Sequence, residues 1–437
     1  MRVAPPFRMA AGDLVKYHGR RVLKNGNSFA VLDPFGHVQA DGIAAEGLFF
    51  EDTRHVSRLN TSINGLQPVL LSSMVTADSA ALLVDLTNPA LVDKGELRQS
   101  KATLHLSNTI VLGEDALFTT LEIRNFDIAE ILFEIAIDVE GDFADIFEVR
   151  GSTRPQRGAI LPVRNEPDGT VLGYRGLDGI IRRTRVLFDP PPDTTNHSRA
   201  TWRIHLPPSG GFAVQSTMLC ERDGHAARSA SPVSSLLTLE RRRTERRLQT
   251  AQVCTDNENF NDWLQRSGAD LDMLVTETPQ GLYAYAGIPW FSTAFGRDGL
   301  ITALECLWMD PHLAAGTLAF LAANQAAAPE PAADAEPGKI LHETRKGEMA
   351  ALGEVPFRRY YGSVDDAAVC NVGWPILRAH RGSHPHPRAL AEHRRGARLD
   401  DCAGRPQRRR LYRIRQDFPG RIDQPRVEGQ RRRNLPC

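Results

Sequence analysis

The chain has 437 residues, of which 41% are hydrophobic and 24% charged, and its formal net charge is zero. This length allows two or three domains with a large core, and the composition is ordinary for a soluble globular protein. The sequence has no apolar run long enough for a signal peptide or a membrane-spanning helix. Its six scattered cysteines form no CxxC pair, so we expect a cytoplasmic protein without a zinc cluster or a disulfide framework.

The zero net charge conceals two unlike parts of the chain. Residues 371–437 hold 17 Arg, no Lys and 6 Asp or Glu, a net charge of +11, so residues 1–370 carry a net charge of −11. Such a difference in composition indicates that the last part of the chain is not built like the rest.

From about Arg20 to Cys220 the pattern is typical of β-strands. Apolar and polar residues alternate along 131–140 and again along 202–206, which is the period of a half-buried strand. The turn at 207–211 predicts a hairpin between its flanking strands, and Leu177-Asp178-Gly179-Ile180 predicts another. Many short strands with frequent turns favour an antiparallel β-sandwich, which we place at residues 15–230.

The composition becomes helical at residues 233–252, where Glu and Arg are interleaved. An arginine run can bind nucleic acid, but acidic neighbours favour a solvated linker helix. From Asn257 onward the spacing of apolar residues predicts further helices, and Asp310-Pro311 predicts a helix start with Asp310 as its N-cap.

The segment GIPWFSTAFGRDGLITAL, residues 287–304, carries the clearest chemical pattern. Trp290 and Phe291 precede an Arg297–Asp298 pair that lies between two glycines, at the predicted start of a helix. Aromatic faces can stack on a sugar ring, and the fork of an arginine with a carboxylate suits vicinal hydroxyl groups. The alternative interpretation is that Asp298 only caps the helix and Arg297 is its surface neighbour.

Several long motifs, taken in order, resemble one family. They are GLFFEDTRHVSRL (47–59), DFADIFEVRG (142–151), the 287–304 segment and HETRKGEMAALGEVPFRRYYGSVD (342–365). Over about residues 20–365 the chain resembles the bacterial amylo-α-1,6-glucosidase or glycogen-debranching-like glycoside hydrolases. The resemblance implies a β + α multidomain fold: an N-terminal antiparallel β-sandwich, a linker helix, and at 253–365 the first part of an (α/α)6 six-hairpin barrel. In related barrels, including glucoamylases, an Arg-Asp pair at this turn binds hydroxyls of the sugar next to the scissile bond.

The resemblance also implies inverting hydrolysis of an α-glucosidic bond, which needs a carboxylic acid and a second carboxylate roughly 6.5–9.5 Å away. The carboxylates available in the matching region are Glu343, Glu348, Glu354 and Asp365. None has the context of the family's acid, an Asp just after a Gly-Trp pair, and the base would lie still farther downstream. We therefore expect Glu343, Arg345, Tyr361 and Asp365 to line the cleft, or else to stabilise loops, and Arg54 to be structural or to lie at the domain contact.

After Asp365 the family pattern is lost. The segment RIDQPRVEG (421–429) can be encoded so that a one-base shift reads SINQGWKDS, which contains the expected context of the acid, and two other segments behave likewise. We hypothesise a frame change near Asp365–Asp366, which makes 366–437 an off-frame, irregular, disordered tail and removes both catalytic carboxylates. A basic nucleic-acid-binding arm is the alternative, but the absence of Lys and of interleaved aromatics disfavours it.

The sequence therefore predicts a protein of α-glucan metabolism that binds a glucan or oligosaccharide but is itself inactive, with exposed apolar faces where the barrel is incomplete. No metal or other cofactor, nucleic acid or membrane is expected as a partner. An inverting phosphorylase of similar architecture and a non-catalytic carbohydrate-binding remnant are the alternatives. The pattern leaves open the linkage preference and the oligomeric state.

Overall fold

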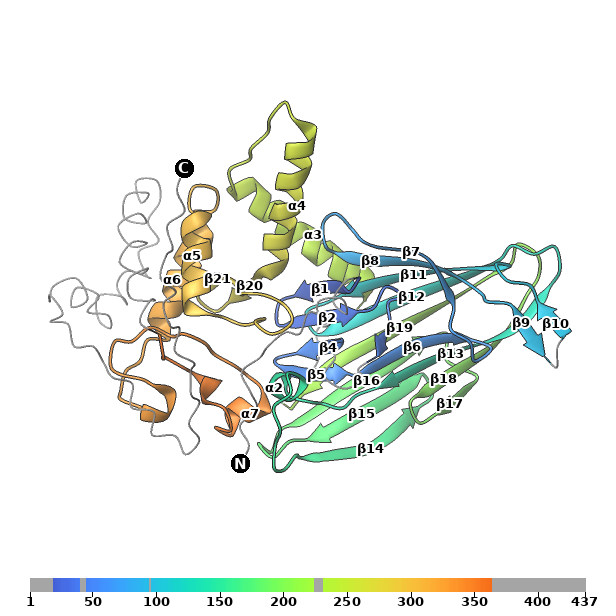
Figure 1. The fold of residues 1–437 in the computed structure, drawn as a ribbon, viewed down its shortest axis with the longest axis horizontal. Helices are drawn as coiled ribbons and strands as arrows, with labels where there is room; N and C mark the ends of the chain where they lie inside the picture. Colours follow the sequence, from blue (N-terminus) through green and yellow to red (C-terminus); the bar gives the residue numbers. More distant parts are fainter. Residues whose placement is uncertain (1–18, 40–44, 94–95, 224–230, 364–437) are drawn as a thin grey trace, which may run out of the picture.

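The computed structural model describes residues 19–39, 45–93, 96–223 and 231–363 (Figure 1). Two parts are visible in it: a long β-structure that extends to the right in Figure 1, and a smaller, mainly helical unit at its left end. Asp365, the predicted tail at 366–437 and the first residues of the predicted sandwich lie outside the described residues.

The larger sheet of the β-structure is antiparallel and has the strand order β14-β15-β16-β19-β12-β11-β8-β7. In chain order its strands are β7 (Val69–Val75), β8 (Ala81–Thr87), β11 (Leu104–Leu112), β12 (Ala116–Asn125), β14 (Ala159–Glu166), β15 (Gly169–Arg175), β16 (Ile181–Asp189) and β19 (Gly211–Arg222).

The second sheet has the order β17-β18-β13-β6-β3 and faces the first. Its strands are β3 (Val38–Gln39), β6 (Arg58–Ile63), β13 (Ile131–Glu140), β17 (Thr194–Asn196) and β18 (Arg199–Leu206). A smaller four-stranded sheet lies toward the helical unit, and a two-stranded hairpin lies at the opposite end (Figure 1). Their strands are β1 (Arg21–Asn25), β2 (Ser28–Leu32), β4 (Gly47–Phe50) and β5 (Thr53–Val56), and then β9 (Leu91–Asp93) and β10 (Glu96–Gln99).

One large apolar core fills the space between the sheets. The alternation seen along 131–140 and 202–206 turns one row of side chains into this core, so that Ile135 pairs with Trp202 and both are almost fully buried. The Trp202 ring meets Phe188 of the opposite sheet edge-on at a centroid distance of 5.2 Å. Burial of each large apolar side chain contributes about 1.5–3 kcal/mol. The predicted antiparallel sandwich is therefore confirmed.

The predicted hairpin at 207–211 is wrong, because β18 and β19 belong to opposite sheets. Asn125, at the end of β12, donates side-chain hydrogen bonds to the carbonyls of Leu206 and Pro207, and its backbone amide bonds to Gly210. The chain is thereby directed to pair with β12 instead of turning back on β18. Alternating strands on both sides of a turn suit a hairpin and a corner between sheets equally well, so the sequence pattern could not separate them. The turn at 177–180 does join two paired strands, β15 and β16.

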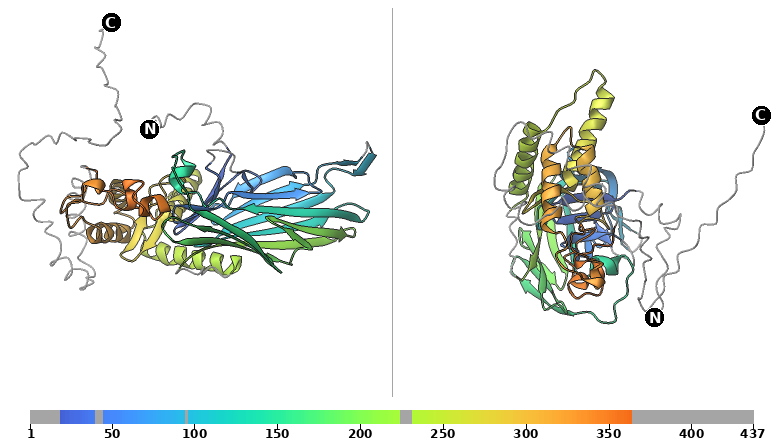
Figure 2. Two further views of the ribbon diagram at one scale, coloured as in Figure 1. Left: turned by 90° about the horizontal axis from the view of Figure 1, so that it is seen from below. Right: turned by 90° about the vertical axis from the view of Figure 1, so that its left-hand side faces the viewer.

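Helix α3 (Pro232–Gln249) follows the last strand of the sandwich and lies along its outer face, as the left view in Figure 2 shows. Leu236 packs on an apolar cluster of the larger sheet that includes Val111 and Phe118. The short helix α2 (Ile146–Val149) follows β13 and is closed by a capping box between Asp145 and Glu148. It lies where the sandwich meets the helical unit (Figure 1).

The helical unit begins with α4 (Glu258–Leu274), capped by Asn257, and continues through a two-stranded hairpin that the sequence did not predict. Its remaining elements are β20 (Val275–Thr278), β21 (Gly281–Ala284), α5 (Gly296–Glu305), α6 (Pro311–Ala323), the 3-10 turns η1 (Pro331–Ala333) and η2 (Pro356–Arg358), and α7 (Glu348–Ala351). Asp310 caps α6 with Pro311 at its first position, as predicted. The hairpin escaped prediction because its strands are only four residues long and too short to show a period.

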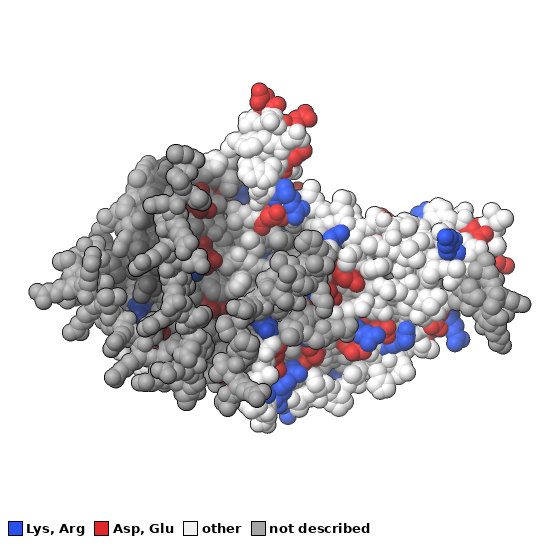
Figure 3. Space-filling view, viewed as in Figure 1, with Lys and Arg blue, Asp and Glu red and all other residues white. Residues whose placement is uncertain are grey.

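The helices among the described residues do not close a barrel, and α4 stands apart from α5 and α6 in Figure 1. Large apolar side chains of this unit are exposed, including Trp263 of α4 and Trp308 in the turn after α5, which are 62% and 63% exposed. On the face of the sandwich shown in Figure 3, acidic and basic groups are interspersed. The predicted fold class, an antiparallel sandwich followed by an incomplete helical unit, agrees with the structure.

Candidate functional site

The segment 287–295, which we call the aromatic turn, lies directly before α5. Gly287 and Phe291 exchange two backbone hydrogen bonds of 3.0 and 3.1 Å, which close the turn around Trp290. The Trp290 ring is half-buried against a cluster that contains Phe147 of the sandwich, whereas Phe291 is 45% exposed. Of the two aromatics predicted to hold a sugar, Phe291 has the more accessible face.

Arg297 and Asp298 are the second and third residues of α5, which begins at Gly296. The N-cap is Phe295, and Asp298 does not cap the helix, so the simple capping interpretation is wrong. Both side chains are half-buried in the first turn of α5, and the exposed Phe291 meets Phe295, the residue before that turn, at a ring-centre distance of 5.7 Å. An acidic side chain in the first turn also interacts favourably with the helix dipole.

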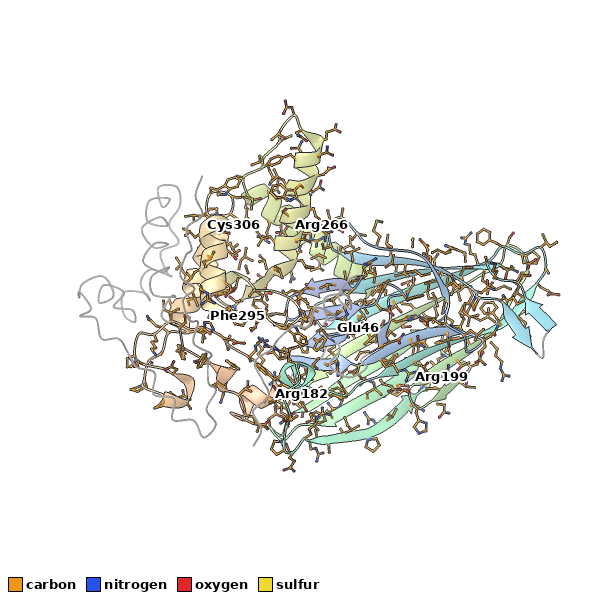
Figure 4. The ribbon with its side chains drawn as sticks, viewed as in Figure 1. Glu46, Arg182, Arg199, Arg266, Phe295 and Cys306 are labelled. Atoms are coloured by element: carbon orange, nitrogen blue, oxygen red, sulfur yellow. The ribbon has the colours of Figure 1, made fainter. Side chains whose placement is uncertain are left out.

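The glycine after this pair is required by packing. A Cβ atom on Gly299 would lie 2.5 Å from the hydroxyl oxygen of Tyr283, which donates a 2.8 Å hydrogen bond to the Phe295 carbonyl at the start of α5. The fully buried Tyr283 therefore fixes the position of the first turn, and Figure 4 shows Phe295 at the lower end of α5.

Arg345 connects the aromatic turn to the sandwich. Its guanidinium donates to Glu343 at 2.6 Å, to Asp52 of the sandwich at 3.0 Å and to the Trp290 carbonyl at 2.7 Å. Burial disfavours the charge, but the two carboxylates outweigh this and raise the pKa of Arg345. Arg345 and Glu343 are both buried, so their side chains hold the segment 342–346 in place from within.

Two further carboxylates that were candidates for the catalytic acid are also engaged in hydrogen bonds with an arginine. Glu348 accepts hydrogen bonds from Arg154, from the Tyr174 hydroxyl and from the backbone of Leu177, and Glu354 accepts two bonds from Arg154. Burial alone would raise the pKa of Glu348, but these donors outweigh it and lower the pKa. A general acid needs the opposite shift, so Glu348 is not suited to protonate a leaving group.

Tyr361 lies inside the helical unit. It is buried in the apolar cluster around Tyr283, and its hydroxyl donates a 3.0 Å hydrogen bond to the Asn324 carbonyl. Burial raises its pKa. These contacts suit the loop-stabilising alternative, whereas Asp365 lies outside the described residues.

The described residues contain no group of three or more His, Cys, Asp or Glu side chains that could hold a metal ion. Within the same residues, no helix is long and apolar enough to cross a membrane.

Comparison with known proteins places the sandwich in a family. Residues 23–217 match the family model described as the N-terminal domain of some glycogen debranching enzymes. This part of the chain belongs to that family. No curated protein sequence matches the chain.

Among solved structures, a protein described as a kojibiose phosphorylase from the human microbiome has a TM-score of 0.51 at 8% identity, over 69% of this chain and 46% of its own. A bacterial glucoamylase complexed with acarbose has a TM-score of 0.40 at 11% identity, over 86% of this chain and 61% of its own. An Escherichia coli K12 protein described as an aldose 1-epimerase gives 0.28 at 10% identity, over 46% of this chain and 98% of its own. The first supports a common fold, whereas the other two TM-scores are too low to carry an argument.

The match over residues 23–217 supports the predicted resemblance to glycogen-debranching-like proteins, and the similarity to the first structure supports the fold. The chain spans 46% of the phosphorylase and 61% of the glucoamylase, so it covers only part of either protein.

Sequence reasoning missed several residues of the sandwich that reach this site. Asp52 binds Arg345, and Asp145 accepts a hydrogen bond from the backbone of Met349. Burial raises the pKa of Asp145 to about 7. Both acids lie in the motifs at 47–59 and 142–151, in which the sequence pattern singles out only Arg54. Arg54 is buried and forms an ion pair with Asp142.

Proposed function

We propose that this chain is the sugar-holding part of a glycoside hydrolase of the amylo-α-1,6-glucosidase type. Its ligand is the terminal glucosyl unit of an α-glucan or oligosaccharide, which stacks on the aromatic turn while Arg297 and Asp298 bind its hydroxyls. The membership of a debranching-like family supports the substrate class. The cytoplasmic location and the absence of nucleic acid as a partner remain predictions.

The observation that carries this proposal is the position of Arg297 and Asp298 at the start of α5. Both are half-buried in the first turn of α5, Asp298 is not the N-cap of this helix, and the exposed Phe291 meets the N-cap residue Phe295 at a ring-centre distance of 5.7 Å. A guanidinium and a carboxylate offer a planar fork of donors and a pair of acceptors, which together match adjacent hydroxyl groups of a sugar. The exposed aromatic ring offers the apolar face that a sugar ring needs.

The same geometry supports the proposal that the chain does not catalyse. Three of the four candidate carboxylates, Glu343, Glu348 and Glu354, are held in ion pairs with Arg345 or Arg154. An inverting hydrolase needs one carboxylic acid beside the leaving oxygen and a second carboxylate to activate water. We place both of those groups in the reading frame that follows Asp365.

The test of sugar binding is a titration of the full chain with a malto-oligosaccharide by isothermal calorimetry. Asp298→Asn should weaken binding about tenfold or more, because it removes the charged acceptor proposed to bind a sugar hydroxyl. Glu305→Gln makes the same chemical change at the exposed end of the same helix and should leave the affinity within about twofold. Equal affinities for the two variants would refute the assignment of Asp298.

The test of catalysis compares the chain with a version whose reading frame is restored after Asp365. We expect no turnover of a branched α-glucan by the first and release of glucose by the second. Release of glucose 1-phosphate only when phosphate is added would instead assign the phosphorylase reaction. Turnover by the unrestored chain would contradict the loss of the catalytic carboxylates.

A further inference from the structure

Arg150 is a sandwich residue that reaches the aromatic turn. It follows α2 as the C-cap residue, in the motif at 142–151. Its guanidinium carbon lies 5.8 Å from the ring centre of Trp290, 5.5 Å from that of Phe291 and 6.0 Å from that of Phe147. Two of these three rings are the ones expected to hold the sugar.

The charge of Arg150 has no anionic partner among the described residues. The other arginines of this junction are paired: Arg154 with Glu348 and Glu354, Arg157 with Glu148, and Arg345 with Asp52 and Glu343. No hydrogen bond or ion pair of the Arg150 side chain occurs within the same residues. Its contacts with the three rings use none of its N–H donors, and no group of the described residues accepts a hydrogen bond from them.

A half-buried guanidinium next to aromatic rings is energetically unfavourable unless oxygen atoms accept hydrogen bonds from its N–H groups. Arg150 is half-buried, and burial together with the nearby Arg345 charge lowers its pKa, while Glu343 only partly offsets this. Contact with aromatic faces stabilises a guanidinium but satisfies none of its N–H groups. The α2 capping box and the packing of Phe147 hold Arg150 beside the aromatic turn, where no carboxylate of the described residues forms an ion pair with it.

We propose that Arg150 is a further saccharide-binding residue, supplied by the sandwich, which donates hydrogen bonds to hydroxyl oxygens of the glucosyl unit held at Trp290 and Phe291. This inference rests on the proposed function of the aromatic turn. The ligand class is a neutral sugar with adjacent hydroxyls, because a planar fork of donors next to an aromatic face matches the edge and the face of such a ring.

A consequence is that the bound sugar touches both parts of the molecule. Arg297 and Asp298 approach it from α5, and Arg150 approaches it from the debranching-type sandwich. The sandwich then acts in substrate binding as well as in supporting the helical unit.

The experiment titrates the full chain and its variants with a malto-oligosaccharide by isothermal calorimetry. Arg150→Met keeps an unbranched apolar side chain against the rings and should weaken binding about tenfold or more, because hydrogen bonds from a charged donor are lost. Arg150→Lys keeps the charge without the fork and should also weaken binding. Arg157→Met removes the neighbouring arginine, which is paired with Glu148, and should leave the affinity within about twofold.

The outcomes separate this inference from the proposed function. Unchanged affinity of folded Arg150→Met, with binding lost in Asp298→Asn, would overturn the role of Arg150 alone. Absence of binding by the wild-type chain would overturn both. If Arg150→Met alters the thermal unfolding curve, the affinity of Arg150→Lys is the deciding measurement. Wild-type affinity in that variant would refute the proposal that the planar guanidinium donates to the sugar. Competition by inorganic phosphate that disappears in Arg150→Met would show an anion site instead, and would also refute the saccharide role.

Discussion

The sandwich and the helical unit differ in how completely they bury their apolar side chains. In the sandwich, the inward rows of two sheets meet in a continuous core, and Leu86, Ile135 and Val214 are essentially inaccessible. In the helical unit, Trp263 on α4 and Trp308 beyond α5 are more than half exposed. The first part has the packing of a finished domain, whereas the described helices have apolar faces without described neighbours.

The two parts also differ in where the contacts that stabilise their strands and helices come from. Each sandwich strand has its partner within residues 21–222. A helix in a helical bundle or barrel gains most of its stability by packing an apolar face on other helices. The described helices therefore depend more than the strands do on contacts from outside themselves, and two tryptophans allow this to be measured.

The largest expected effect comes from truncating a sandwich tryptophan. Trp202→Ala should lower the free energy of unfolding by about 3–5 kcal/mol, because the ring is 3% exposed and packs on Phe188. Its indole N–H also donates to the carbonyls of Pro190 and Pro191. Chemical denaturation followed by circular dichroism at a β-sheet wavelength would measure the change.

Trp263→Ala is the matched substitution in the helical unit. The ring is 62% exposed, so the free energy of unfolding should change by no more than about 0.5 kcal/mol. We also expect less aggregation, measured by light scattering, because an exposed apolar group is removed. Comparable losses of stability for the two variants would show that the helical unit is packed as well as the sandwich.

The next effect concerns the junction between the two parts. Arg345→Met should cost about 3 kcal/mol locally, because Asp52 and Glu343 lose their common buried cation. Limited proteolysis should then cut residues 342–361 faster. Lys346→Met is the control: this neighbouring cation pairs with Glu51, but its side chain is 50% exposed, so its loss should cost no more than about 1 kcal/mol. Equal cleavage rates for the two variants would rule out Arg345 as the residue that holds this segment.

The sequence predicted the sandwich well because half-buried strands show a two-residue alternation of apolar and polar residues. The rows at 131–140 and 202–206 face the core as their alternation requires. It failed at the 207–211 corner, since the choice of sheet depends on Asn125, a residue 81 positions before Leu206 that no local pattern connects to it. The four-residue strands β20 and β21 are set by packing of the hairpin on α5 and α6, and not by their own composition.

The candidate site was predictable only in part. The residue types of the aromatic turn and of the Arg297–Asp298 pair predict a sugar site, because they lie within one short segment of the chain, and this role stays a prediction. Asp52, Arg150 and Asp145 could not be assigned to the same place, because they lie more than a hundred residues away in the chain and only the fold brings them to Arg345, Trp290 and Met349. That the charge of Arg150 has no described anionic partner is likewise a property of the fold.

A smaller effect than that of Trp202→Ala or Arg345→Met is expected at the other side of the junction, as a pH dependence. Lys24 of β1 is 4% exposed, and its ammonium donates to Gly26, to Thr276 of β20 and to the carbonyl of Leu274 in α4. Burial lowers its pKa to about 7. The folded protein therefore binds fewer protons than the unfolded chain between about pH 7 and the ordinary lysine pKa, near 10.4.

Stability rises with pH wherever the unfolded state binds more protons, so this lysine should make the wild-type protein more stable as the pH increases above 7. Relative to Lys24→Met, which cannot titrate, the free energy of unfolding should increase by about 2 kcal/mol between pH 7 and about pH 9, a window in which the shift predicts slightly less than one proton of difference. Other titrating groups contribute equally to both proteins and cancel in the comparison. Parallel pH profiles would mean that Nζ stays charged, held by its three oxygen acceptors and the Tyr285 ring 4.7 Å away. In that case the lysine would join the sandwich to the helical unit as a permanent cation, like Arg345.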